Sequence, residues 1–151
     1  MDSFIIATSF YNAPLEYDLE KEFLYAVIKT ESSFKTDALS SAGAQGLMQI
    51  TPETFEWLQM KMGGEHLVLD CNDADLNVKY GAYFLKLLLD EFENKNTALA
   101  AYHAGRGRVN EWLDNPDFST DGVTLDSIPY RDTEYYVKKV NKAENIYRNL
   151  Y

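Results

Sequence analysis

Glu31 stands where the sequence predicts the buried face of a helix. Helical spacing predicts a helix over residues 18–33, with an apolar stripe formed by Leu24, Val27 and Ile28. Glu31 lies seven residues after Leu24 and four after Val27, so its side chain continues this stripe. Burial and the negative end of the helix dipole would both raise the pKa of this carboxyl group, as a general acid near neutral pH requires. The same spacing also fits a glutamate at a frayed helix end that reaches solvent.

A run of small residues follows this helix and would let a bulky ligand lie close to the backbone. Apart from Gln45, residues 40–46 have small side chains, and their backbone N–H groups can donate to acetyl or hydroxyl oxygens. A flexible connector would have the same composition. Gln49 stands just before Thr51, the predicted N-cap of the next helix. Its amide offers a donor and an acceptor to a polar ligand, or is an ordinary surface group.

Few residues are available for metal, thiol or redox chemistry. The chain has one cysteine, Cys71, and two histidines, His66 and His103. A single cysteine excludes an internal disulfide. As a nucleophile Cys71 would need an activating histidine, whereas as a small buried apolar residue it needs none. With so few nitrogen and sulfur ligands, we expect neither a transition-metal site nor a cofactor.

Length and charge restrict the class of partner. The 151 residues fit one domain, residues 1–151, and can bury a core without metal or disulfides. The formal net charge of -10 disfavours nucleic acid and anionic membrane surfaces, which need clustered Lys and Arg, but is compatible with a polysaccharide. Residues 1–10 lack the basic segment of a signal peptide and the length of a membrane span. The chain therefore works in the cytoplasm or has lost an export segment.

Helical periodicity recurs along the chain, and no long segment alternates with period two. The predicted fold is therefore mainly α, with little or no β structure and at most one short hairpin. Beyond residues 18–33, the predicted helices run from Thr51 to Gly63, from Asp73 or Asp75 to Phe92, from an N-cap at Asn96 to Gly105, over Val109–Leu113, and from an N-cap at Asp132 to Tyr147. Residues 37–49 and 115–131 are predicted to be loops.

Four groups of residues occur in an order that resembles the soluble lytic transglycosylase (SLT) domain family. They are Glu31-Ser32; Gly43-Ala44-Gln45-Gly46-Leu47-Met48-Gln49-Ile50 with Pro52; Ala101-Tyr102-His103-Ala104-Gly105; and Ile128-Pro129-Tyr130 with Thr133 and Tyr136-Val137. The residues Asn77, Tyr80-Gly81-Ala82 and Phe84-Leu85 match the same family. Each motif alone is weak, but their order and spacing extend over residues 19–147. Residues 1–17 would form an N-terminal extension.

The resemblance implies a fold, a substrate and a reaction. The fold would be a single lysozyme-like domain, similar to goose-type lysozyme. The substrate would be the glycan strand of peptidoglycan, cut between N-acetylmuramic acid and N-acetylglucosamine. The reaction would leave a 1,6-anhydro-muramoyl end instead of adding water. The resemblance also implies action outside the cytoplasm, in the periplasm or cell wall, within a larger protein or alone, and we expect a monomer.

The motifs also imply roles for individual residues. Glu31 matches the catalytic glutamate of the family, which acts first as acid and then as base. Ser40 and Gln49 match positions that hold acetamido and hydroxyl groups of the substrate. Tyr102 matches a tyrosine that forms hydrogen bonds in the cleft near the glutamate, and Tyr136 matches a second cleft tyrosine. Both tyrosines would equally serve as core aromatic residues on helices.

Two positions depart from the family pattern. His103 replaces the asparagine that is usual in the Ala-Tyr-Asn-Ala-Gly motif. A neutral imidazole still donates one hydrogen bond to a substrate but adds a dependence on pH; it would equally pack in place or bond a loop carbonyl. Asp132 falls where the family often carries a glutamate. It serves either as the N-cap of the last helix or as a substrate contact.

A single carboxylate fits the implied reaction. Ordinary glycosidases use two, whereas internal attack by the muramoyl 6-hydroxyl needs no activated water and gains from a tethered nucleophile. A lysozyme-type hydrolase is one alternative, and it would need a second carboxylate from Glu53, Asp37 or Asp132. A catalytically silent wall-binding or assembly module is the other alternative, which the presence of Glu31 and Gln49 disfavours.

Overall fold

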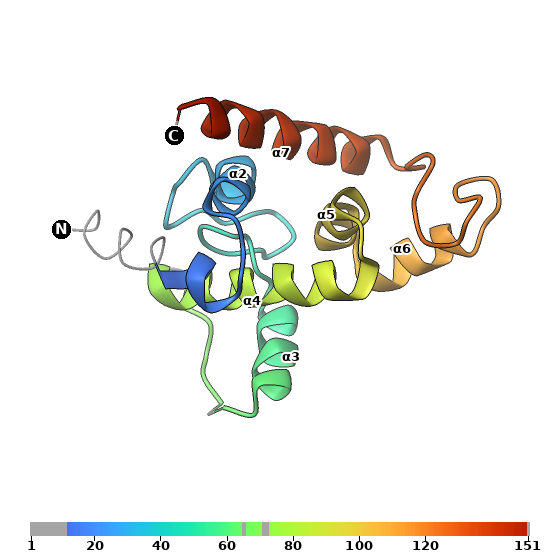
Figure 1. The fold of residues 1–151 in the computed structure, drawn as a ribbon. Coiled ribbons are helices and arrows are strands. Elements are labelled where there is room, and N and C mark those ends of the chain that lie inside the picture. Colours follow the sequence, from blue (N-terminus) through green and yellow to red (C-terminus); the bar gives the residue numbers. More distant parts are fainter. Residues whose placement is uncertain (1–11, 65, 71–72, 151) are drawn as a thin grey trace.

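Three levels of helices make up the body of the molecule, seen in Figure 1. The computed structural model describes residues 12–64, 66–70 and 73–150. The C-terminal helix α7 (Arg131–Leu150) lies across α2 (Lys21–Ser32) and α5 (Lys95–Ala104), and α5 in turn packs on α4 (Ala74–Phe92). Within the described ranges only isolated β-bridges occur, in the loop between α2 and α3. The prediction of a mainly helical fold is therefore confirmed.

Helix α2 buries its predicted apolar stripe. The side chains with no exposed surface include Leu24, Val27 and Ile28. The helix begins at Lys21 and not at Asp18, because Asp18 adopts a left-handed conformation with φ 52° that no right-handed helix can include. Ser33, also left-handed with φ 52°, ends the helix. Glu31 therefore lies in the last turn, next to the loop of small residues.

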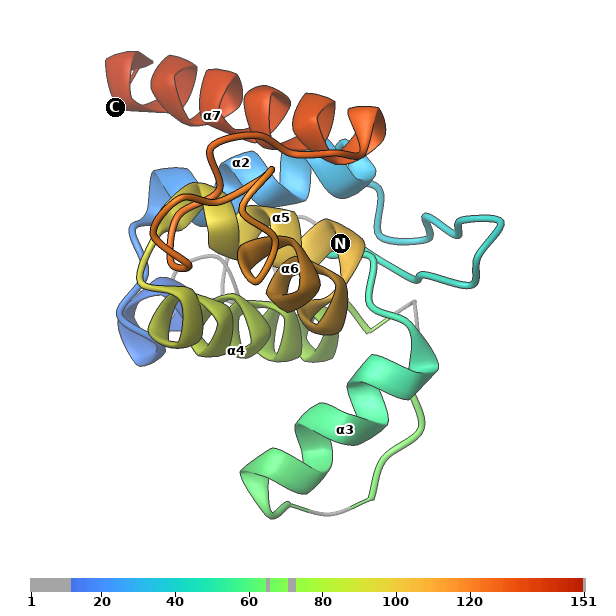
Figure 2. The same ribbon diagram turned by 90° about the vertical axis from the view of Figure 1, so that its right-hand side faces the viewer.

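Helix α3 (Pro52–Met62) projects from the body of the molecule, as Figure 2 shows, and packs against α4. Its first turn is held by the predicted N-cap, because the Thr51 hydroxyl accepts a hydrogen bond from the Thr54 N–H at 3.2 Å. Left-handed Gly63 ends it as predicted. Asp73 caps α4 in the same way, accepting from the Leu76 N–H at 2.9 Å.

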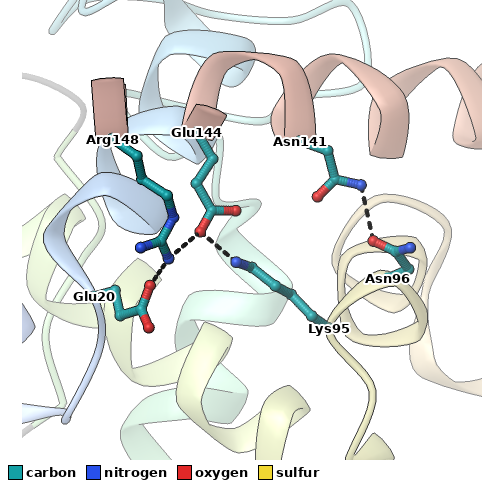
Figure 3. Close-up of polar contacts among 6 residues, drawn as sticks. All are labelled: Glu20, Lys95, Asn96, Asn141, Glu144 and Arg148. Carbon is teal, nitrogen blue, oxygen red and sulfur yellow. Dashed lines mark hydrogen bonds and ion pairs between the residues drawn. The ribbon is translucent and has the colours of Figure 1, made fainter. Parts of the chain in front are cut away.

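The helices of the C-terminal half begin at residues other than those predicted. Asn94 caps α5, because its side chain accepts a hydrogen bond from the Thr97 N–H at 3.0 Å. Asn96, the predicted cap, instead accepts a hydrogen bond from Asn141 of α7 (Figure 3). Helix α6 (Arg106–Leu113) starts directly after Gly105, three residues before the predicted start. Helix α7 starts at Arg131, so Asp132 lies inside its first turn and is not its N-cap.

An ionic cluster ties the C-terminal half of α7 to two other parts of the chain (Figure 3). The Glu144 side chain is only 5% exposed and pairs with Lys95 of α5 and with Arg148 one turn along α7. Arg148 also pairs with Glu20, the residue before α2. A buried carboxylate is stable only when it is paired, so the two cations hold α7 in place above α2 and α5. This fixes where the first turns of α7 meet the rest of the molecule.

Two sequence predictions fall outside the described residues. They concern the absence of an export segment in residues 1–10 and the role of Cys71. The described part of the predicted N-terminal extension packs on the body, since the Tyr17 ring lies 5.7 Å from the ring of Tyr83 on α4. None of the described helices combines the length and the apolar composition that crossing a membrane requires.

Candidate active site

A cleft of about 460 Å³ opens where α2, α3, α4 and α5 meet the loop at residues 33–51. Five of the seven predicted site residues line it: Glu31, Ser40, Gln49, Tyr102 and His103. These side chains come from α2, from the loop and from α5. The tertiary structure therefore brings together motifs that are up to 72 residues apart in the sequence, between Glu31 and His103.

Close packing holds the loop against α4. A Cβ atom on Gly46 would lie 2.4 Å from the amide nitrogen of Asn77, and one on Gly81 would lie 2.3 Å from the sulfur of Met48. Asn77 is fully buried; it accepts a hydrogen bond from the Met48 N–H at 2.8 Å and donates one to the Gln45 carbonyl at 2.9 Å. Because any larger side chain would push the loop away from α4, these residues determine the wall of the cleft.

Gln49 and Ser40 face the cleft, but the loop already uses some of their polar atoms. The Gln49 amide nitrogen donates to the carbonyls of Ala38 at 3.1 Å and Gly46 at 2.9 Å. Both of its hydrogens are therefore engaged, and only the side-chain carbonyl oxygen is left for a ligand. This corrects the interpretation that Gln49 offers both a donor and an acceptor. Ser40 Oγ accepts from the Ala44 N–H at 3.0 Å, which leaves its hydroxyl hydrogen for a ligand.

Tyr102 links α5 to the same loop. Its hydroxyl donates a hydrogen bond to the Met48 carbonyl at 2.6 Å, and its ring lies 5.1 Å from the ring of Phe84. Burial, and to a lesser degree the charge of Glu31, raises the pKa of this phenol well above its usual range. Tyr102 is therefore a neutral donor whose proton is directed at the loop backbone. It supports the wall of the cleft near Glu31.

Glu31 is a carboxyl group in an apolar setting. Burial raises its pKa from 4.5 to about 7, while the nearby Tyr136 hydroxyl acts in the opposite direction. The helical phase of Glu31 is compatible with this rise, although the phase alone also fitted a glutamate that reaches solvent. A carboxyl group that titrates near pH 7 can give up a proton in one step and take one up in the next.

Tyr136 stands beside Glu31, on α7, but is not among the residues that line the cleft. Its side chain is 6% exposed, and its hydroxyl makes no hydrogen bond of standard geometry with the described part of the chain. Burial first, and then the charge of Glu31, raises the pKa of this phenol well above its usual range. Since α7 packs along α2, the two groups meet where these helices cross.

His103 connects the cleft with the first turns of α7. Its ring stacks on Tyr136 with the centroids 4.6 Å apart and the planes at 26°, and its Nδ1 lies 3.0 Å from the Thr133 hydroxyl oxygen. Burial lowers the pKa of His103, and the charge of Asp132 opposes this effect. The lowered pKa favours the neutral imidazole over its cation. When Nδ1 accepts a hydrogen bond from Thr133, Nε2 carries the proton and is the remaining donor of the ring.

Glu31 is the only carboxylic acid among the described residues that line the cleft. The three candidates for a second carboxylate, Glu53, Asp37 and Asp132, are exposed and lie outside the cleft wall. Asp132 is close enough to His103 to affect its pKa. The cleft therefore contains one acid/base group, surrounded by hydroxyl, amide and imidazole groups that can bind sugar substituents.

Comparison with known proteins assigns the chain to a family. The sequence model of the family described as the transglycosylase SLT domain matches residues 9–122. The chain belongs to this family. The soluble lytic murein transglycosylase of Salmonella typhimurium is 33% identical over 142 residues, which cover 88% of the SLT chain and 21% of that protein. The transglycosylase of Enterobacteria phage PRD1 is 36% identical over 98 residues, which cover 65% of the SLT chain and 34% of that protein. The SLT chain thus spans about a fifth of the length of the first relative.

Solved structures of lytic transglycosylases share the fold. The 70 kDa soluble lytic transglycosylase of Escherichia coli superposes with a TM-score of 0.82 and 25% identity. The match covers 95% of the present chain and 24% of the Escherichia coli chain. A lytic transglycosylase of Pseudomonas aeruginosa superposes with a TM-score of 0.79 and 29% identity. That structure is of an inactive variant in which glutamine replaces a glutamate, and the match covers 93% of the present chain and 23% of the Pseudomonas aeruginosa chain. The expected fold of the SLT family is therefore confirmed.

Three residues of the SLT chain contribute to the site although sequence reasoning did not select them for it. Thr54 and Phe84 line the cleft, and Thr133 holds His103. Phe84 was indistinguishable from a core residue because it falls on the inward face of its helix. Thr133 stands in the fourth motif but was given no role there, although it lies three residues before Tyr136 and so shares its helix face.

Proposed function

We propose that this SLT domain is a peptidoglycan lytic transglycosylase, which cleaves the β-1,4 bond between N-acetylmuramic acid and N-acetylglucosamine. The observation that carries the proposal is the single acid of the cleft, Glu31, with its pKa raised to about 7. Ordinary glycosidases place two carboxyl groups around the scissile bond. One carboxyl group suits a substrate that supplies its own nucleophile. The names of the relatives support the same activity.

Glu31 acts first as the acid. Its protonated carboxyl group donates to the glycosidic oxygen, the bond from that oxygen to the muramoyl C1 breaks, and the N-acetylglucosamine side leaves as an alcohol. The N-acetyl oxygen of the same muramoyl residue stabilises the cationic carbon. Burial favours this step, because it keeps the proton on Glu31 up to about neutral pH.

Glu31 acts next as the base. Its carboxylate takes the proton from the muramoyl 6-hydroxyl, and the hydroxyl oxygen bonds to C1 and closes the 1,6-anhydro ring. Glu31 is protonated again and no water is consumed. The nucleophile belongs to the same sugar, so its effective concentration is high. The nearby Tyr136 hydroxyl would stabilise the carboxylate between the two steps, since it acts to lower the Glu31 pKa.

The polar groups around Glu31 would hold the sugars. The Ser40 hydroxyl can donate, and the Gln49 carbonyl oxygen can accept, which suits the acetamido and hydroxyl groups of the glycan. The Nε2–H of His103 would supply the donor that asparagine supplies in the family motif. Tyr102 acts through the loop that it holds. Asp132 is exposed beside His103 and would contact only substituents at the rim.

The place of action follows from the substrate. Peptidoglycan lies outside the cytoplasm, so the domain would act in the periplasm or cell wall. The relatives described as murein transglycosylases support this location. We also propose a monomer as the active form.

Product analysis tests the proposal. Purified chain is incubated with peptidoglycan sacculi, and the released fragments are identified by mass spectrometry. We expect 1,6-anhydro-muramoyl ends from the parent chain and about 10³-fold fewer from Glu31→Gln. Reducing muramic acid ends would instead show a lysozyme-type hydrolase. Binding to sacculi without cleavage would show a wall-binding module.

A further inference from the structure

An aromatic and cationic surface continues one end of the cleft. Thr54 of α3 and Phe84 of α4 both line the cleft. Trp57 and Lys61 follow Thr54 by three and seven residues, which places all three on one face of α3. Phe84 meets the Trp57 ring edge to face, with the centroids 6.0 Å apart. We call Trp57, Lys61 and Arg106 the Trp57 site.

Two cations lie against the indole ring of the Trp57 site. The guanidinium carbon of Arg106 is 5.0 Å from the ring centroid, and the ammonium nitrogen of Lys61 is 5.4 Å from it. Arg106 directly follows Gly105, which lines the cleft. These contacts restrain two long side chains that would otherwise move in solvent. The charges are therefore held at a defined place beside the cleft.

The Trp57 site carries an excess of positive charge in a chain whose formal net charge is -10. Glu91 of α4 pairs with Arg106 through Nε at 2.6 Å and Nη2 at 3.3 Å. Within the described ranges Lys61 forms no ion pair with a carboxylate, whereas Arg106 is paired only with Glu91. A cation without its own counter-charge, fixed at the end of a cleft, suits a ligand that brings an anion.

We propose that the Trp57 site binds a carboxylate of the peptide stem carried by the muramoyl residue. The inference rests on the proposed function, which makes peptidoglycan the substrate. The hydroxyl and acetamido groups of the glycan are neutral, whereas the peptide attached to the lactyl group carries carboxylates. The positive charge of the site is therefore matched by the stem and not by the sugars. The indole ring adds apolar surface for the aliphatic part of the stem.

The dimensions of the stem fit this placement. A stem of four residues spans about 14 Å when extended, at about 3.5 Å per residue. The seven residues from Thr54 to Lys61 correspond to a rise of about 10 Å along α3. A stem whose sugar lies in the cleft near Thr54 therefore reaches both cations without leaving the face of α3.

Paired substrates separate recognition of the stem from cleavage of the glycan. One substrate is purified glycan strands with their stems, and the other is the same strands after an amidase has removed the stems, which leaves only the lactyl carboxylate on each muramoyl residue. The measured quantity is kcat/KM on the stem-bearing strands divided by kcat/KM on the stem-free strands, both from the release of 1,6-anhydro ends. For the double variant Lys61→Gln, Arg106→Gln we expect this ratio to fall about fivefold to tenfold, through KM. The fall should shrink at high salt, because salt screens exposed charges.

Two further variants sharpen the comparison. Lys142→Gln changes an exposed lysine of α7 and is the matched control, for which the ratio should equal that of the parent. Glu91→Gln removes the carboxylate that competes for Arg106 and should raise the ratio. An unchanged ratio in the double variant, or an equal loss on both substrates, would overturn the proposal.

A binding measurement keeps this result separate from the proposed function. Calorimetry with soluble N-acetylmuramoyl tetrapeptide needs no cleavage, and the double variant should bind it about fivefold to tenfold more weakly than the parent does. Equal binding by the two proteins would refute the site even if both cleave peptidoglycan. If the parent forms no 1,6-anhydro ends but binds the peptide as expected, the proposed function fails and the Trp57 site stands.

Discussion

Replacing Glu31 with glutamine measures how far the buried carboxylate lowers the free energy of unfolding. The pKa of this group is about 7 in the folded protein and 4.5 as the ordinary value, so the folded state holds the proton more tightly. Below pH 4.5 both states are protonated and the titration of Glu31 contributes nothing to stability. As the pH rises from 4.5 to about 7 the unfolded chain ionises first, and the free energy of unfolding falls. Above that range the loss is complete.

The pKa difference sets the size of the effect. A rise from 4.5 to about 7, at about 1.36 kcal/mol for each pKa unit, corresponds to about 3 kcal/mol. Solvent at the mouth of the cleft reduces this energy by screening. We therefore expect the free energy of unfolding of Glu31→Gln to exceed that of the parent by about 1–3 kcal/mol at pH 8 and to equal it at pH 4. Glutamine has nearly the same shape and no charge at either pH. In a chain of this length the gain corresponds to about 3–9 °C in Tm.

Thermal unfolding between pH 4 and pH 8 measures the difference, and product release measures activity. Glu31→Gln should lose activity by about 10³-fold, because an amide has no acidic proton to give to the leaving oxygen. The same variant should gain stability at high pH. Glu111→Gln, on the exposed surface of α6, is the control and should follow the pH dependence of the parent. Parallel stability curves for the parent and Glu31→Gln would mean that the carboxyl group is solvated, and the reasoning about a buried acid would be wrong.

Three further substitutions test the surroundings of this acid. Tyr136→Phe removes the hydroxyl that lowers the Glu31 pKa, so the alkaline limb of the kcat/KM profile should move to higher pH; an unmoved limb would show that the two groups do not interact. His103→Asn removes a group that becomes cationic as the pH falls; activity at pH 7 should persist, and the profile measured between pH 5 and pH 8 should lose part of its acid limb. Gly46→Ala puts a methyl group 2.4 Å from a buried amide nitrogen at φ 77°, and urea denaturation should show a loss of about 2 kcal/mol or more. The same change at Gly64, where the added methyl meets nothing, should have little effect.

Helix faces were easier to predict than helix ends. The burial of α2 follows the helical period, so residue spacing alone predicted the apolar stripe that Glu31 continues, while the exposure of Glu31 itself stayed open. The start of α5 could not be predicted in this way, because Asn94 and Asn96 are equally good capping residues. The path of the chain decided between them: Asn94 meets the helix N–H groups, and Asn96 meets α7.

The sequence predicted which residues belong to the site, but not which of their atoms are left to bind a ligand. Sequence reasoning selected Gln49 as a residue that faces the ligand, yet its amide hydrogens are held by loop carbonyls. It selected His103 and Tyr136 separately, whereas the structure stacks their rings. Hydrogen bonds and ring contacts between distant segments depend on distances of a few ångströms, which residue type and spacing do not specify.

The sequence by itself determined that one acid would stand at the end of an apolar helix face, beside a loop of small residues. Both properties depend only on residue type and on the period of the helix. Only the tertiary structure decided that this acid would be isolated from other carboxylates, raised in pKa and faced by Tyr136. It also decided that the cleft would continue to the two cations around Trp57. The reason is that desolvation and charge act over short distances between α2, α3, α6 and α7, and the crossing of those helices sets the distances.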